Sequence, residues 1–456
     1  MVWLLQTKAA ILGFFAFFFI FLVGVVKYQK KIIDKRLIRA ISVLTFTLLL
    51  LAVVITILKK DKFSRIFDQN SSFERLALWK NSENMIKENF LLGVGAGNWQ
   101  INFPKYGLGK FQVEEVKMGL TTFQRPHNDF LWVFCEMGFV GLLIYLSIFI
   151  TIVYQLIQLF RKYKEQEISW LYLILLATCI GYIIIAFFDF PFERVEHQIL
   201  LFVIFSIASA HYYHNFYAIK AHKNIALKFP IIVIMLFIPV CFSFSVSSMR
   251  CSGEFHSQKM YLYKNIGNWD LLINEANKAT NSCYSIDPMS IPIDWYKGVA
   301  FFSKGNSIVA QKYFEQAYLI APFNIHVLNN LASCYESLKK HDKAEKLYVK
   351  ALFISPQFDE ARLNLSAVYY NEGKFDKAFE TIDLCNINST DEKYKQFLPS
   401  ILNSWVNQLL KKQKDKQLIN HLNCILATKN KVMDLYLASK AKRVKFEPYI
   451  FNNQDD

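Results

Sequence analysis

Signals for metal binding and for export are missing from this sequence of 456 residues. Its eight cysteines include no CxxC pair, so structural zinc has no support. His211 and His214 lie close together but lack further ligands nearby, and we therefore expect no metal site. No basic segment precedes the first apolar run and no small-residue cleavage site closes it, which argues against a cleavable signal peptide.

Charge is also missing from long stretches of the first half of the chain. Apolar residues make up 53% of the sequence and are concentrated there, whereas the rest has the composition of a soluble domain. Because a membrane span takes about 20 apolar residues, we predict an all-α protein, with a bundle of about six transmembrane helices followed by a soluble part. The predicted spans are Trp3–Val26, Ala40–Leu58, Phe130–Phe160, Ile168–Phe188, Ile199–Ala210 with its flanks, and Phe229–Val246.

The formal net charge of +15 has a simple source in the loops between these spans. Lys27–Arg39 holds six Lys or Arg residues, Arg161–Glu167 opens with RKYK, and Lys220, Lys223 and Lys228 precede the last span. These loops alternate to the same side, which the positive-inside rule places in the cytoplasm. The charge therefore gives no reason to expect a nucleic-acid partner.

The opposite side receives a large outer loop, residues 59–126, and everything after the last span. In a bacterium this side is the periplasmic face of the inner membrane. Lys59, Lys60 and Lys62 run against the rule, but they open a loop longer than about 60 residues, where the rule weakens. Cys251 and Cys283 would lie on the oxidising side, where they could form a disulfide.

The soluble part repeats with a period of 34 residues, as the spacing of Pro322 and Pro356 shows. Small residues, an aromatic residue and a proline recur in the order typical of tetratricopeptide repeats. The residues in phase, which we expect to be buried between paired helices, are Phe301, Ala310, Ala317, Tyr335, Ala344, Ala351, Tyr369 and Ala378. Because such arrays usually bind other proteins, we expect a protein partner.

The period also suggests domain boundaries. Residues 1–249 form the membrane domain, 250–290 a linker with a degenerate repeat, 291–392 three repeats, and 393–456 a helical cap with a loose tail. The repeats are Ile291–Asn324, Ile325–Phe358 and Asp359–Glu392.

The outer loop contains a glycine-rich stretch, LLGVGAGNW, after an amphipathic helical pattern that extends from about Arg75 to Ile86. A dinucleotide-binding loop would need a preceding strand and a βαβ unit, and neither is evident. We therefore expect Gly93, Gly95 and Gly97 to form a tight turn that exposes backbone.

Three stretches together resemble the O-antigen ligase/polymerase superfamily of bacterial membrane glycosyltransferases. They are TKAAILG near the first span, ERLALWKNSENMIKENFLLGVGAGNW in the outer loop, and RPHNDFLWVFCEMGFVGLLIYL at the entry to the next span. The most specific part is HN..L....E.G..G, from His127 to Gly141. The resemblance covers about Thr7–Ala210. Members of the family have more spans than the six predicted here, so we expect this chain to correspond to the second half of such an enzyme.

The resemblance implies transfer of a glycan from a polyprenyl-diphosphate carrier to a hydroxyl of a lipid, a glycan or a protein, without metal or other cofactor. The hydroxyl needs a base, and His127 can accept a proton at neutral pH. The diphosphate needs positive charge, and Arg125 and Arg75 can grip phosphate oxygens with paired hydrogen bonds. Lys8 is a third cation, at a position where the family often has arginine.

Asn128, Glu136 and Asp189 are candidate supporting residues. Asn128 would cap the helix after His127, and Glu136 would orient His127 or form hydrogen bonds within the bundle. Asp189 lies in the outer turn DFPFERVEH, which would line the site or simply be a polar turn. Gly138 and Gly141 are expected to permit close helix packing, because small residues let helices approach closely.

Each site residue also has a structural explanation. His127 could stand beside a capped helix start, Arg125 could anchor at lipid headgroups, and Arg75 could lie on a solvated helix face. For the whole protein, the alternative is a membrane-anchored scaffold whose repeats recruit partners for polysaccharide assembly. A transporter with His127 and Glu136 as a proton relay is a third alternative, but it would call for broken spans near the midplane. An anchor has no need for RPHNDF or ERLALW, so we prefer the glycosyltransferase.

Overall fold

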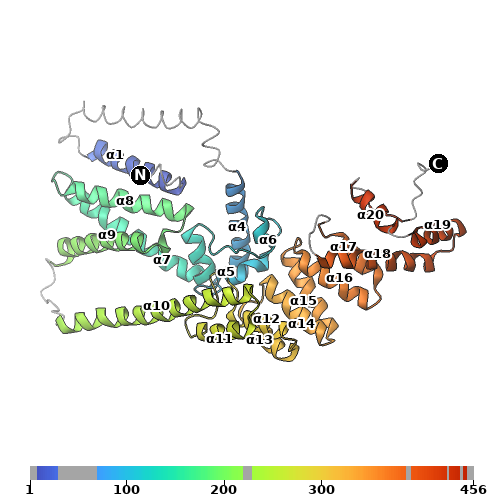
Figure 1. Cartoon of the computed structure of the whole chain (residues 1–456). Coiled ribbons are helices and arrows are strands. Elements are labelled where there is room, and N and C mark those ends of the chain that lie inside the picture. Colours follow the sequence, from blue (N-terminus) through green and yellow to red (C-terminus); the bar gives the residue numbers. More distant parts are fainter. Residues whose placement is uncertain are drawn as a thin grey trace. The chain divides into compact units, whose positions relative to one another are not determined.

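The computed structural model describes residues 8–28, 69–218, 229–386, 392–428, 431–441 and 445–448 (Figure 1). These residues form helices joined by turns, and none of them lies in a β-sheet. They form two compact units. The membrane unit comprises Met1–Tyr106 and Phe123–Val240, and the repeat unit comprises Gly107–Thr122 and Cys241–Asp456. The predicted all-α fold class is confirmed.

Long apolar helices make up most of the membrane unit. They are α1 (Lys8–Tyr28), α7 (Asp129–Lys162), α8 (Ser169–Phe188), α9 (Val195–Tyr213, continued by the π-helical turn η3, His214–Ala218) and the start of α10 (Phe229–Asn265). Four of them, α7 to α10, are long and apolar enough to cross a bilayer, and α1 holds a shorter apolar stretch. The predicted span Ala40–Leu58 lies outside the described residues. The chain is a multi-pass membrane protein.

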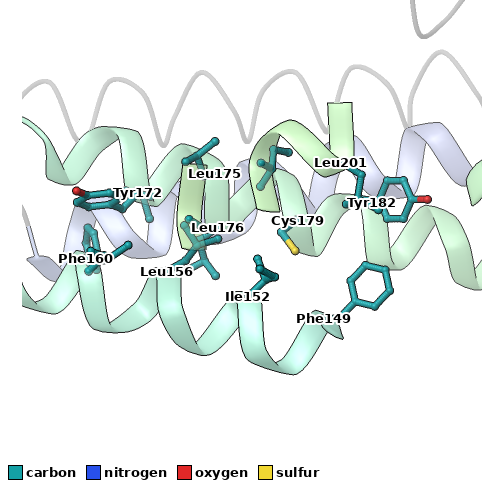
Figure 2. Packing of buried hydrophobic residues seen from close by; sticks show 14 of the residues in the cluster. Phe149, Ile152, Leu156, Phe160, Tyr172, Leu175, Leu176, Cys179, Tyr182 and Leu201 are labelled. Atoms are coloured by element: carbon teal, nitrogen blue, oxygen red, sulfur yellow. The ribbon is translucent and has the colours of Figure 1, made fainter. Parts of the chain in front are cut away.

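Helices α7, α8 and α9 pack around a continuous apolar core (Figure 2). Residues three or four positions apart on α7, such as Ile152, Leu156 and Leu159, fall on one helical face, and all three are buried. They meet the buried face of α8, which carries Tyr172, Leu176 and Cys179. This core fixes the outer ends of α7 and α8, where the candidate site residues lie.

Glycines allow α1 to approach α8 closely. A Cβ atom on Gly13 would lie 3.0 Å from the Gly181 carbonyl oxygen. In the same way, a Cβ atom on Gly181 would lie 3.0 Å from the Gly13 carbonyl oxygen. Further along the same pair, a Cβ atom on Gly24 would lie 2.3 Å from Leu173. Small residues at such crossings are typical of helices that pack in lipid.

The outer loop has helices of its own. Those in the membrane unit are α4 (Gln69–Glu88), α5 (Trp99–Asn102) and η1 (Phe103–Tyr106). A further short helix, η2 (Pro191–Glu193), lies in the turn between α8 and α9. The predicted amphipathic helix is α4, which buries Leu78 and Met85. Trp99 is completely buried, stacks on Phe103 with ring centroids 4.4 Å apart, and donates a hydrogen bond to the Ser82 hydroxyl.

Helix α10 continues without a break from the last span into the repeat unit. Its 37 residues correspond to about 55 Å at 1.5 Å per residue, whereas the hydrocarbon core of a bilayer is about 30 Å thick. The helix is therefore long enough to cross a membrane and to project beyond it.

The repeat unit is built from helix pairs at the predicted period. The pairs are α12 (Ile293–Ser303) with α13 (Ser307–Ile320), α14 (Ile325–Ser337) with α15 (His341–Ile354), and α16 (Asp359–Asn371) with α17 (Phe375–Asp383). Helix α11 (Trp269–Ala279) precedes them, and α18 (Glu392–Lys412), α19 (Lys416–Ala427) and α20 (Lys431–Ala441) follow. The short helix α6 (Glu114–Lys117), from the outer loop, also belongs to this unit.

The predicted phase of the repeats is confirmed by burial. All five in-phase alanines are completely buried, and Tyr335 and Tyr369 are buried as well. Phe301 differs: it is half-buried, because its ring stacks on Tyr313 at 5.4 Å on the surface of the first pair.

The end of the repeat unit departs from the sequence predictions in one place. Phe446, in the tail that we expected to be loose, is buried. Its ring lies 5.5 Å from Tyr436 and 6.0 Å from Trp405, so it completes an aromatic cluster on the cap helices. Cys251 and Cys283 are both free in the structure.

Candidate active site

Helix α7 begins with a capped turn directly after His127. Asn128 is the N-cap residue, and its side-chain oxygen accepts a hydrogen bond from the Leu131 N–H at 2.9 Å. His127 precedes this cap with a φ of 54°, in the left-handed region that non-glycine residues rarely adopt. This conformation costs roughly 1–2 kcal/mol. Strained residues of this kind cluster at functional sites.

The imidazole of His127 faces Asp189, which follows the last residue of α8. Its Nδ1 lies 3.8 Å from Asp189 Oδ1, longer than a hydrogen bond but within ion-pair distance. This nitrogen is enclosed and has no hydrogen-bond partner among the residues that the structure describes, whereas 34% of the side chain is exposed. The ring therefore points one nitrogen at a carboxylate and leaves another part open to solvent.

Asp189 is held in its charged form. Burial favours the neutral acid, but His127, the backbone N–H of Phe190 and the Arg194 guanidinium together hold the pKa of Asp189 below its usual value. A charged, mostly buried carboxylate in this position is suited to fix the orientation of the histidine ring.

Phe190 gathers three basic side chains around its ring. The His127 ring packs against it edge-on, with centroids 5.0 Å apart. The Cζ atoms of Arg125 and Arg194 lie 4.6 Å and 5.3 Å from its centroid, which are cation–π distances. Phe190 was not predicted, because nothing in the sequence distinguishes it from the other phenylalanines of the outer turn.

Both arginines have acidic neighbours. Arg125 forms an ion pair with Glu193, and Arg194 Nη2 lies 3.9 Å from Asp189 Oδ2. Burial lowers the pKa of Arg125 and the carboxylate of Asp129 opposes this change, but a guanidinium keeps its charge. Because Glu193 is 43% exposed, it can turn into solvent when another anion takes its place.

Asp129 ties the start of α7 to the outer turn. Its side chain is completely buried, and Oδ2 accepts a hydrogen bond from the Phe192 N–H at 3.0 Å. A carboxylate in the first turn of a helix is also favoured by the helix dipole. The contact holds η2, and with it the residues on either side, beside His127.

Arg75 supports the site from helix α4. Its Nη1 donates a hydrogen bond to the Phe188 carbonyl at 2.8 Å, at the end of α8. One turn further along α4, Trp79 donates from Nε1 to the Pro126 carbonyl at 2.9 Å. Helix α4 thereby holds the two segments that carry Asp189 and His127, so Arg75 positions other site residues in this structure.

Glu136 serves the glycine-rich loop. Its two carboxylate oxygens accept hydrogen bonds from the backbone N–H groups of Gly97 and Trp99, at 2.8 Å and 3.0 Å. The structure gives Glu136 this role rather than that of orienting His127. The three glycines of the loop all have positive φ, which agrees with the predicted tight turn.

Helix α7 breaks where the glycine-rich loop meets it. Gly138 has φ 67° and ψ −168°, and the carbonyls of Cys135 and Glu136 accept hydrogen bonds from Val94 and Gly95 of the loop. A Cβ atom on Gly138 would lie 2.3 Å from the Leu91 carbonyl oxygen. Gly138 therefore permits contact between loop and helix, and the prediction that it serves helix packing is wrong.

The structure brings together most of the predicted site residues at the outer ends of α7 and α8: Arg125, His127, Asn128 and Asp189, with Arg75 behind them. Lys8 is the first residue of α1, and its side chain lies outside the described part of the chain. Within the described ranges, no three histidine, cysteine or acidic side chains come together as a metal site would require. The cluster has the groups needed to move a proton and to stabilise an anion.

Comparisons with known proteins agree with the division into two parts. Residues 1–146 match the family model described as O-Antigen ligase, and residues 326–358 match the model of the tetratricopeptide repeat. Both resemblances inferred from the sequence are confirmed. The first match supports a membrane glycan-transfer role, and the second supports protein–protein interaction.

Individual relatives and solved structures are similar to parts of the chain only. The protein described as "Uncharacterized protein ycf37" from Pyropia yezoensis is 41% identical over 58 residues, which are 13% of this chain and 33% of that protein. The chain thus spans about a third of the length of this relative. The solved structure "MamA MSR-1 C2" is similar at 17% identity over 41% of this chain and 98% of its own, with a TM-score of 0.30. The solved structure "Crystal structure of MamA protein" is similar at 16% identity over 42% of this chain and 94% of its own, with a TM-score of 0.31.

Proposed function

With an O-antigen ligase domain over residues 1–146 as the premise, we propose that this protein transfers a glycan from a polyprenyl-diphosphate carrier to an acceptor hydroxyl. The reaction takes place on the periplasmic face of the bacterial inner membrane. The supporting observation is that His127, partly exposed and facing Asp189, shares the Phe190 ring with two arginines.

His127 is the base in this proposal. The acceptor oxygen attacks the anomeric carbon of the glycan while the imidazole takes its proton, and the bond from that carbon to the diphosphate oxygen breaks. Asp189 holds the Nδ1 side of the ring and stabilises the imidazolium that forms. Because the donor is already activated by its diphosphate, no nucleotide is consumed.

Arg125 and Arg194 stabilise the departing diphosphate. The Arg125 Cζ atom packs over the Phe190 ring and lies 5.9 Å from the Trp132 ring centroid. These two contacts keep the guanidinium in a fixed orientation. The diphosphate replaces Glu193 as the partner of Arg125, and the charge that develops on the leaving oxygen strengthens the new pair.

The test is His127→Ala in the full chain, assayed for transfer from a polyprenyl-diphosphate-linked oligosaccharide. Loss of a general base lowers the rate by about 10²–10⁴. His197→Ala is a matched control, because His197 lies beyond the outer turn and its Nδ1 is 3.7 Å from Glu196. A fully active His127→Ala protein would leave the scaffold function, with the repeats recruiting other enzymes, as the better account.

A further inference from the structure

The part of α10 beyond the membrane carries large apolar side chains on its surface. The predicted span ends at Val246, and Phe255 and Leu262 follow nine and 16 residues later. At 1.5 Å per residue they lie about 14 and 24 Å further along the helix, whereas the polar layer of a bilayer extends only about 5–8 Å beyond its hydrocarbon core. Lipid therefore does not cover these two side chains, which are 57% and 56% exposed. Apolar side chains exposed in this way indicate an interaction surface.

The repeats use the opposite side of this helix. Gly253, Ser257 and Met260 are buried in the repeat unit, and a Cβ atom on Gly253 would lie 2.4 Å from the Tyr284 ring. With 3.6 residues per turn, the exposed apolar residues fall about 180° away from these three. The exposed surface of α10 is therefore separate from the one that attaches the helix to the repeats.

The exposed side of α10 follows the seven-residue period of a coiled coil. Two-stranded coiled coils bury the first and fourth residues of each seven, called a and d. With Phe255 and Leu262 at a, Cys251 and Gln258 fall at d, and the same spacing extends back into the span. The residues at these two positions, which we call the α10 seam, are Ile234, Phe237, Cys241, Phe244, Ser248, Cys251, Phe255, Gln258, Leu262 and Asn265. All are exposed and none is charged, so α10 presents one uncharged stripe from the span to its end.

The charges that flank the seam match a second copy of the same helix. In a parallel pair, a residue at position g lies beside the residue five positions later, at position e, on the other helix. Glu254 is at g and Lys259 is at e, five positions later and of opposite charge. Both are exposed, and neither forms an ion pair with another residue that the structure describes. Two-fold symmetry would form this pair twice, once in each direction.

We propose that α10 is a dimerisation helix: two copies of this chain pair in parallel along the α10 seam, from the lipid into the water beyond it. Both copies cross the membrane in the same direction, so a parallel arrangement is the one open to them. The small side chains of Ser248 and Cys251 lie where the helix leaves the membrane and let the two backbones approach. Phe255 and Leu262 then pack knobs-into-holes, which covers them. Because the same face is used on both copies, the assembly closes at two.

The first test is disulfide crosslinking of single-cysteine variants in membranes from cells that make the full chain. The background carries Cys241→Ser, Cys251→Ser, Cys283→Ser and Cys424→Ser, and copper phenanthroline is the added oxidant. Restored Cys251, Gln258→Cys and Leu262→Cys should each give covalent dimers at least tenfold faster than Arg250→Cys. Arg250 is the matched control, because it is exposed and adjacent to Cys251 in the sequence but points away from the seam.

The second test is charge reversal, with the dimer fraction of the full chain measured by single-molecule photobleaching in lipid vesicles. Glu254→Lys alone and Lys259→Glu alone should each weaken dimerisation by about fivefold or more, because two attractive pairs become repulsive. The variant with both changes should recover the wild-type dimer fraction. A merely structural role of either residue would not produce this recovery.

A third variant removes the apolar contacts outside the membrane. Phe255→Asp with Leu262→Asp should lower the dimer fraction at least tenfold, and it leaves the fold intact because both side chains are exposed. Leu319→Asp is its control, since Leu319 is exposed on α13 and lies away from the seam.

Three results would overturn the proposal: equal crosslinking at Arg250→Cys and at the seam, a dimer fraction unchanged by Phe255→Asp with Leu262→Asp, or seam crosslinks to a different protein in place of a second copy. His127→Ala should dimerise normally, so failure of the glycan-transfer proposal and failure of this one are separate outcomes.

Discussion

His127 has an unusual backbone for a residue with a side chain. Its φ of 54° is stable only because the neighbouring contacts determine it: the Asn128 cap follows it, and the Trp79 indole is bonded to the Pro126 carbonyl before it. The unfavourable backbone conformation is the one that places the His127 imidazole beside Asp189. Ser290 and Lys339, in turns of the repeat unit, have similar φ values, so the position of the ring beside Asp189, and not the φ angle alone, points to a functional role for His127.

Arg125 gives a prediction at the same scale. Arg125→Lys should lower the rate of glycan transfer, because an ammonium can neither stack flat on Phe190 nor form two parallel bonds to a diphosphate. The loss should be larger than for Arg194→Lys, since the Arg125 side chain is 14% exposed and that of Arg194 is 42% exposed. Equal rates of glycan transfer in the two lysine variants and the wild type would show that a positive charge alone stabilises the diphosphate.

His326 and His341 make stability depend on pH with opposite signs. Burial lowers the pKa of His326, although Glu360 and the carbonyl of Gly119 oppose this. The folded form stays neutral, so the unfolded chain takes up the proton and stability is lost as pH falls through about 6.5.

His341 behaves in the opposite way. A hydrogen bond to Glu336 raises its pKa, so its contribution is complete below about pH 6.5 and is lost as pH rises through its folded value. Thermal unfolding between about pH 5 and 8 should therefore show less acid sensitivity in His326→Gln and less alkaline sensitivity in His341→Gln. Unchanged pH profiles would mean that other groups control the stability.

At the scale of elements, the break in α7 is the most unusual feature. One helix ends near Glu136 and another starts after Gly138, and the backbone groups freed at the break are bonded to the glycine-rich loop. The loop, the break and the carboxylate of Glu136 form one joint. The candidate site sits on the short outer piece of α7, whereas the longer inner piece packs in the membrane core.

Gly138→Ala tests this joint. The variant should lose about 1–2 kcal/mol from its left-handed backbone, and more from the clash with the Leu91 carbonyl. Gly97→Ala is the matched control, because it has φ +78° but no heavy atom within 4 Å of the new methyl group. The melting temperature should fall further for Gly138→Ala. Equal shifts in the two variants would show that the backbone strain, and not the close contact, matters.

At the scale of the whole molecule, we predict that the repeats lie outside the cytoplasm. The basic loops alternate to one side of the predicted spans, and α10 runs from the last span into the repeat unit. Alkaline phosphatase, which is active only in the periplasm, should be active when fused to the end of the chain. A fluorescent cytoplasmic reporter at the same point would contradict the orientation.

Local patterns in the sequence were enough for much of the fold. The alanines at 34-residue spacing, the Asn128 cap and the amphipathic helix α4 each depend on neighbours along the chain or on a repeated period. The cluster of Arg125, His127 and Asp189 was predicted through a motif. The Gly138 break could not be predicted, because the apolar pattern of α7 continues through it, and the role of Phe190 depends on contacts that no spacing encodes.

The docking of the outer-loop segment Gly107–Thr122 on the repeats is the least local feature of all, since 238 positions separate Ser355 from Lys117, whose carbonyl accepts its hydrogen bond. A ribosome adds about 5–20 residues per second, so roughly 12–48 s pass between the synthesis of the two residues. During that interval the segment is made but its binding surface does not exist. A nascent chain therefore has to keep Leu108, Phe111 and Val116, all buried in the finished protein, from misfolding or proteolysis. This delay makes the loop a natural point for a chaperone to act.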